Sequence, residues 1–240
     1  MIKELNIFLK KENLTMAGLG FSAGLPIMLV FSTLSVWLVK AGIERSTVTL
    51  FSWAGFAYSF KFLWSPIVDK FQIPMLKKIG HRKSWLITTQ ILIFISIIMA
   101  SYSNPQNNLK FMAIAIVLIA FFSATQDIAI DAFRIESAPE KKQGPLSSMY
   151  LAGYRVAMIV SGAGSLWLAS FLGGENYQQD VWKQVYQTIS LFMIVGLVST
   201  LLSKEPNIKN KNKINRLDQI KFTLSTILSI IVFFVVFFNF

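Results

Sequence analysis

The stretch that decides the fold is Phe111–Arg134, FMAIAIVLIAFFSATQDIAIDAFR. A helix needs about 20 mainly apolar residues to cross a bilayer, and this run is long enough. Two aspartates, Asp127 and Asp131, lie in its second half. A carboxylate at membrane depth costs about 2.5–3.5 kcal/mol on insertion scales. We therefore expect these two acids to be paired or to perform a function.

Six other apolar blocks of similar length accompany this one. Spanning backbone must form helices or a closed barrel, because lipid offers no hydrogen-bond partners. Barrel strands are shorter and alternate in polarity, so the blocks predict an all-α integral membrane protein. The seven predicted spans are roughly Leu14–Val39, Thr47–Val68, Ser84–Tyr102, Leu109–Phe133, Leu146–Leu172, Val185–Ser203 and Phe222–Phe240.

Composition excludes several other classes of protein. The chain has 240 residues, 54% of them apolar, no cysteine and one histidine, His81. A disulfide scaffold or thiolate metal site is excluded, and a histidine metal cluster is not expected. We expect no cofactor. The net charge of +11 does not indicate nucleic acid, because the cations lie in loops between apolar blocks.

The distribution of Lys and Arg predicts the orientation of the chain in the membrane. Seventeen of the 23 basic residues lie at the N-terminus, in the loops after the second and fourth spans, and after the sixth span. Four lie on the alternate side, at Lys40, Arg45, Lys110 and Lys183. Cytoplasmic loops carry the excess of positive charge, so we expect a cytoplasmic N-terminus.

The composition changes once along the chain. Residues 1–203 are predicted to form a six-helix bundle, residues 204–221 a basic cytoplasmic linker, and residues 222–240 a seventh helix. Six helices and a long linker are typical of the first half of a twofold-repeated transporter. We therefore expect a shortened chain whose second half is missing. The alternative is a natural seven-helix protein.

The predicted spans contain few charges. Asp127 and Asp131 are four residues apart and share one helix face. Two carboxylates so close in a medium of low dielectric resist ionising together, so the pair suits the uptake and release of a proton. The structural alternative pairs Asp127 with Lys61 or Arg155, and Asp131 with Arg134.

The cations in the spans suggest a substrate site beside these acids. Lys61 either extends towards the membrane surface or faces a cavity, where it attracts an anion or holds Asp127. Arg155 can bind a carboxylate or phosphate with two hydrogen bonds, or it can be a structural tie to Asp131. The predicted set for proton coupling and substrate is Asp127, Asp131, Gln126, Lys61, Arg155 and Tyr154.

Two glycine-rich stretches lie inside predicted spans. They are Gly18–Gly24, GLGFSAG, and Ser161–Gly164, SGAG. In a membrane helix such residues allow close helix packing, so neither stretch is expected to bind phosphate.

The loop Ser65–Trp85, SPIVDKFQIPMLKKIGHRKSW, resembles the signature between helices 2 and 3 of the major facilitator superfamily. Ser65 stands where the family usually has glycine, and Phe71–Ile79 adds length. In that superfamily the loop carries charges that latch the cytoplasmic side. The alternative is a plain basic loop. The resemblance implies a cytoplasmic gate formed by Asp69, Lys70, Arg82, Lys83 and Arg134.

The chain as a whole is similar to the muropeptide permease (AmpG) family of that superfamily. The matching stretches are GFSAGLP (Gly20–Pro26), KFLWSPIVDK (Lys61–Lys70), HRKSWL (His81–Leu86), SATQDIAIDAFR (Ser123–Arg134) and GYRVAMIVSGAG (Gly153–Gly164).

This resemblance implies a bacterial inner-membrane permease. It would import anhydromuropeptides with protons for cell-wall recycling, and it would need the lipid bilayer and a second half, which a separate chain could supply. The alternatives are an acetyl-coenzyme A-type transporter and a truncated remnant that does not transport. An intramembrane aspartyl enzyme is disfavoured because both acids lie on one predicted helix. We expect no catalytic residue.

Overall fold

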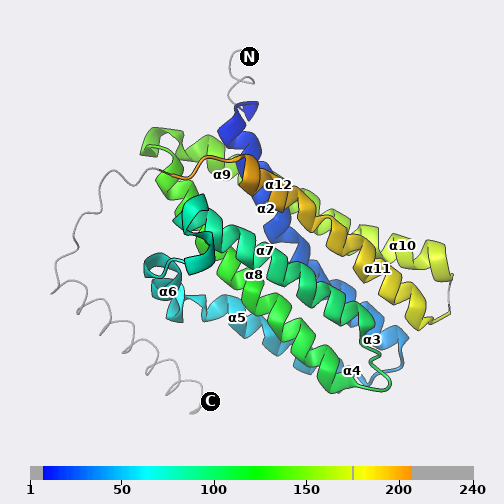
Figure 1. Ribbon diagram of the computed structural model, residues 1–240. Helices are drawn as coiled ribbons and strands as arrows, with labels where there is room; N and C mark the ends of the chain where they lie inside the picture. The colour runs from blue at the N-terminus through cyan, green and yellow to red at the C-terminus, as the bar shows by residue number, and fades with distance from the viewer. Residues whose placement is uncertain (1–7, 175, 207–240) are drawn as a thin grey trace, which may run out of the picture. The chain divides into compact units, whose positions relative to one another are not determined.

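The computed structural model describes residues 8–174 and 176–206 (Figure 1). By its internal contacts the chain divides into two units, Met1–Pro206 and Asn207–Phe240. The fold given below is that of the first unit. The predicted seventh helix, and the predicted linker from Asn207 onwards, lie outside the described residues.

The described residues form helices and no strands. Five helical stretches are long and apolar enough to cross a membrane, and they correspond to the first, third, fourth, fifth and sixth predicted spans. Long helices satisfy their own backbone groups, as lipid requires. The five stretches are Lys11–Lys40, His81–Tyr102 (α7), Leu109–Ser137 (α8), Glu140–Gly173 and Gln179–Leu202.

The second predicted span differs from expectation. A single helix over Thr47–Val68 was predicted, but the structure divides this segment into short pieces. Pro66 has no N–H to donate to the carbonyl of Phe62, and the hydroxyl of Ser65 donates to that carbonyl instead, at 3.1 Å. The pieces are α4 (Arg45–Leu50), η1 (Phe51–Gly55), α5 (Phe56–Ser59), η2 (Lys61–Leu63) and α6 (Ser65–Lys70).

Two of the long stretches are also interrupted. The first bends at Phe31, between α2 (Lys11–Val30) and α3 (Ser32–Lys40). The fourth contains a π-helical turn, η5 (Val160–Gly164), between α9 (Gln143–Ile159) and α10 (Ser165–Gly173). The two interruptions meet, because the hydroxyl of Thr33 donates to the carbonyl oxygen of Ser161 at 2.8 Å. A side chain thus supplies a donor at a point where the helical ladder is irregular.

Helices α2 and α9 approach each other with almost no side chain between their backbones. A Cβ placed on Gly20 would collide with the carbonyl oxygen of Tyr150, and one on Gly153 would collide with the carbonyl oxygen of Ala17. The packing role predicted for Gly18–Gly24 is therefore confirmed.

The sixth predicted span consists of α11 (Gln179–Leu191) and α12 (Met193–Leu202). Its α11 part packs against the first span through aromatic residues. The rings of Trp37 and Trp182 stack at 5.8 Å between centroids, and the hydroxyl of Tyr186 donates to the carbonyl of Leu29 at 2.8 Å. A separate cluster of buried apolar residues joins α2, α7 and α8. Met16, Leu86 and Phe133 are among its members.

Candidate functional site

The central feature is an ion pair between the broken second segment and α8. Lys61 Nζ lies 3.6 Å from Asp127 Oδ2, and the two side chains are 35% and 17% exposed. The other carboxylate oxygen, Oδ1, is buried and has no hydrogen-bond partner among the described residues. A buried charge with one unsatisfied oxygen is costly, so this carboxylate is not simply a well-satisfied structural group.

Local contacts explain why these two side chains meet. The indole N–H of Trp64 donates to the hydroxyl of Thr125 at 3.0 Å, and its ring lies 4.9 Å from that of Phe121. Trp64 therefore attaches the second segment to α8. Lys61 lies one short turn before Trp64, and Asp127 lies two residues after Thr125.

Hydroxyl groups surround the acid. Tyr58, Tyr150 and Tyr154 lie near enough to interact with the charge of Asp127. The hydroxyls of Tyr58 and Ser123 are buried and lie close enough to interact with each other. Groups that both donate and accept hydrogen bonds suit either form of a carboxyl group.

Asp131 lies in a different environment. Its side chain is 52% exposed and its Oδ1 is 3.4 Å from Arg134 Nη2. Arg134 Nη1 also donates to the hydroxyl of Ser147 at 2.7 Å, which ties α8 to α9. The structure therefore contains both carboxylate pairs given as structural alternatives, Lys61–Asp127 and Arg134–Asp131.

Two other residues of the predicted set lie apart from this pair. Gln126 is fully buried, and its Nε2 donates to the hydroxyl of Ser22 on α2 at 2.6 Å. Arg155 is exposed and contacts Met158 Sδ at 3.9 Å. Within the described part of the chain, Arg155 forms no ion pair with Asp127 or Asp131.

Two of the predicted gate residues, Asp69 and Arg82, contact each other, and the side chain of Arg82 is only 7% exposed. Arg82 Nη1 lies 2.8 Å from Asp69 Oδ1, and Nη2 lies 2.6 Å from Glu136 Oε1. Its Nε also donates to Glu136 Oε2, at 2.9 Å. This forked geometry is the strong form of an arginine–carboxylate pair. It joins the ends of α6, α7 and α8, and we call Asp69, Arg82 and Glu136 the latch.

The other gate residues lie around the latch or beside it. Lys83 donates to the carbonyls of Leu201 and Ser203 at the end of α12. Lys70 is exposed, and Arg134 binds Asp131 rather than a latch residue. Sequence reasoning missed Glu136, although it lies in the last turn of α8, and it also missed Glu205, which accepts from the backbone N–H groups of Arg82 and Lys83.

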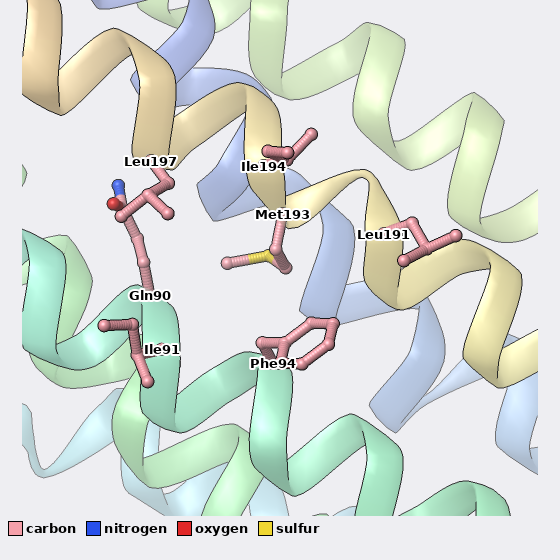
Figure 2. Close-up of a pocket in the computed structure, with 7 residues that line it drawn as sticks. All are labelled: Gln90, Ile91, Phe94, Leu191, Met193, Ile194 and Leu197. Carbon is pink, nitrogen blue, oxygen red and sulfur yellow. The ribbon is translucent and has the colours of Figure 1, made fainter.

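A pocket of about 250 Å³ lies elsewhere, between α7 and the junction of α11 with α12 (Figure 2). Its one polar side chain, Gln90, donates to the hydroxyl of Thr200 at 3.0 Å. The pocket therefore offers no charge to a polar substrate. The residues that line it are Gln90, Ile91, Phe94, Leu191, Met193, Ile194 and Leu197.

The multi-pass helices, the latch and the intramembrane ion pair are features of a membrane transporter. The sequence model of the Major Facilitator Superfamily matches residues 9–240. The chain therefore belongs to this superfamily, whose members are transporters and not enzymes.

The relatives define the branch. The transporter named AmpG 4 in Rickettsia conorii is 37% identical over 197 residues, which cover 82% of this chain and 46% of the relative. The anhydromuropeptide permease of Escherichia coli is 37% identical over 203 residues, which cover 84% of this chain and 39% of the relative. Within the superfamily the chain belongs to the AmpG family, and it spans less than half the length of these relatives.

Proposed function

We propose that this chain forms one wall of a proton-coupled permease that imports anhydromuropeptides across the bacterial inner membrane. Membership of the AmpG family and the name of the Escherichia coli relative support the substrate class. The Lys61–Asp127 pair supports the coupling and is the observation that carries the proposal. A second helical unit, on this chain or another, would close the cavity.

Asp127 can either bind a proton or hold its contact with Lys61. Protonation of Asp127 removes its charge and with it the attraction to Lys61. The ammonium group of Lys61, whose side chain is about one-third exposed, then becomes available to an anionic group of the substrate. Loss of the proton restores the pair. The Asp127 carboxylate and an anionic group of the substrate thus compete for one cation, so protonation of Asp127 favours substrate binding.

The latch provides the proposed gate. It ties together the ends of three helices whose adjoining loops are basic, and the excess of Lys and Arg at this end favours a cytoplasmic position. Ion pairs of this kind can break and form again as helices shift. We therefore place the latch, and the N-terminus, on the cytoplasmic side.

Uptake of labelled anhydromuropeptide tests this function in cells that make this chain together with the rest of the permease. Asp127→Asn should abolish accumulation and leave membrane insertion intact. Asp180→Asn, at an exposed site on α11, is the matched control and should transport normally. Normal accumulation by Asp127→Asn would refute the coupling role. Accumulation of labelled acetyl-coenzyme A, with none of labelled anhydromuropeptide, would refute the substrate class.

A further inference from the structure

We propose that Glu205 is a positioning residue for the latch and acts through Arg82. Its carboxylate caps the start of α7: Oε1 accepts from the backbone N–H of Arg82 at 2.8 Å, and Oε2 accepts from that of Lys83 at 3.0 Å. The first N–H groups of a helix have no partner within the helix, and the helix dipole favours an anion there.

The contact is reciprocal. Lys83, at the start of α7, donates from Nζ to the carbonyl oxygens of Leu201 and Ser203 at 3.2 and 2.9 Å. These carbonyls lie at the end of α12, where a cation is favourable. An anion from beyond α12 therefore caps α7, and a cation from α7 caps α12. We call these four contacts the clamp.

Gly80 leaves room for the clamp. Its φ of +115° favours glycine. A Cβ at this position would also collide with the carboxylate of Glu205. The glycine before the basic run is thus required by the backbone and by the space that the capping carboxylate occupies.

The clamp fixes the backbone from which the Arg82 side chain extends. That side chain must reach Asp69 on one side and Glu136 on the other, with three short contacts. This forked contact can form only if the backbone at Arg82 is held in position. Glu205 does not touch the guanidinium in any contact of the described residues, so it acts through the backbone. The role of Glu205 in gating rests on the proposed function, but its effect on the stability of the protein can be measured without a transport assay.

A double-mutant cycle separates positioning from simple capping. The thermal unfolding midpoint of the purified full chain in detergent is compared for Glu205→Gln, Arg82→Gln and the double variant. We expect Glu205→Gln to lower the midpoint by about 4 °C in the native background and by about 1 °C or less when Arg82 is already replaced. Glu140→Gln, an exposed acid near the same loops, should change neither value.

Equal losses in both backgrounds would show that Glu205 is only a cap and would overturn the proposal. The cycle is repeated in about 0.5 M salt, because long-range attraction between charges is screened there. If the two backgrounds still lose different amounts in the added salt, positioning is supported. If that difference disappears, the proposal is contradicted. Failure of transport in any variant has no bearing on this result.

A labelling measurement in native membranes covers the case in which the variants do not survive purification. The chain has no cysteine, so one can be placed at Ser84, which is fully buried in the first turn of α7. We expect Glu205→Gln to speed maleimide labelling of Ser84→Cys at least about fivefold. Labelling of Ser165→Cys, buried on α10, should not change. An unchanged rate at Ser84→Cys, or an equal rise at both sites, would overturn the proposal.

Discussion

A single carboxylate shows how the bilayer shapes the chemistry of this protein. Asp127 has one oxygen near Lys61 and one without a partner in the described chain. In water such a group would be solvated, but within a membrane helix its charge depends on one cation. Asp131, four residues later, has a half-exposed side chain and a different arginine partner. One helical turn therefore separates a partly buried ion pair from a more exposed one.

Removal of the cation should leave Asp127 uncompensated. We expect Lys61→Met to lower the unfolding free energy by about 1–2 kcal/mol, less than for a fully buried pair because Lys61 is partly exposed. Adding Asp127→Asn should restore part of this loss. Unfolding in detergent measures both effects, with Lys110→Met at an exposed site as control. A double variant less stable than the single one contradicts the pairing.

The glycine contact between α2 and α9 can be tested directly. Gly153→Ala places a methyl group against the carbonyl of Ala17, so we expect a loss of about 1–3 kcal/mol from overpacking. Gly144, on the same helix, has open space around it, and Gly144→Ala should cost nothing. We expect the thermal unfolding midpoint of Gly153→Ala to lie below that of Gly144→Ala. Equal midpoints would mean that the helices are not in backbone contact.

At this scale the sequence predicted residue types better than partners. The spacing of Asp127 and Asp131 correctly placed both on α8, but it could not show that Asp127 is mostly buried and Asp131 half-exposed. Gln126 and Arg155 were predicted to belong to the same site, yet their side chains contact Ser22 and Met158 instead. The direction of a side chain depends on how its helix is rotated against its neighbours, and that is a property of packing.

At the scale of the elements, an apolar segment does not always form one regular helix. The second segment changes between α-helical and 3₁₀ turns, and it presents Lys61 from its η2 turn. The apolar content of this segment predicted a single membrane-spanning helix. Apolar content does not show whether such a helix is regular. Pro66 was visible in the sequence, and Ser65 satisfies the carbonyl that Pro66 leaves free.

The arrangement of the elements predicts the topology of the chain. The loop between α6 and α7 should be cytoplasmic, and the loop between α7 and α8 should lie on the opposite side. A reporter enzyme active only outside the cytoplasm should therefore be inactive when fused after Lys78 and active when fused after Asn107. The reverse pattern would invert the proposed orientation of the gate.

The long-range contacts of the elements were beyond sequence reasoning. Glu205 caps a helix that begins more than a hundred residues earlier in the chain. Nothing local to Glu205 indicates that partner, because the contact exists only when α12 lies beside α7. The loop signature did predict that Asp69 and Arg82 belong together, and the structure places them 2.8 Å apart.

Across the whole molecule, the Lys61–Asp127 pair and the latch occupy different levels of one bundle. Asp127 and Glu136 lie on the same helix, nine residues and therefore about 13 Å apart along its axis. Because both contacts are held by one helix, a rigid shift of α8 would move both together. This connection is what a coupled transporter needs, and sequence reasoning did not find it because it missed Glu136.

The central claim is that Asp127 carries the proton that accompanies substrate. Vesicles that hold the complete permease and an internal pH-sensitive dye test it most directly. Addition of anhydromuropeptide should acidify the lumen when native chain is present. With Asp127→Asn the lumen should stay at its starting pH, although substrate still binds. Acidification at the native rate by Asp127→Asn would contradict the claim.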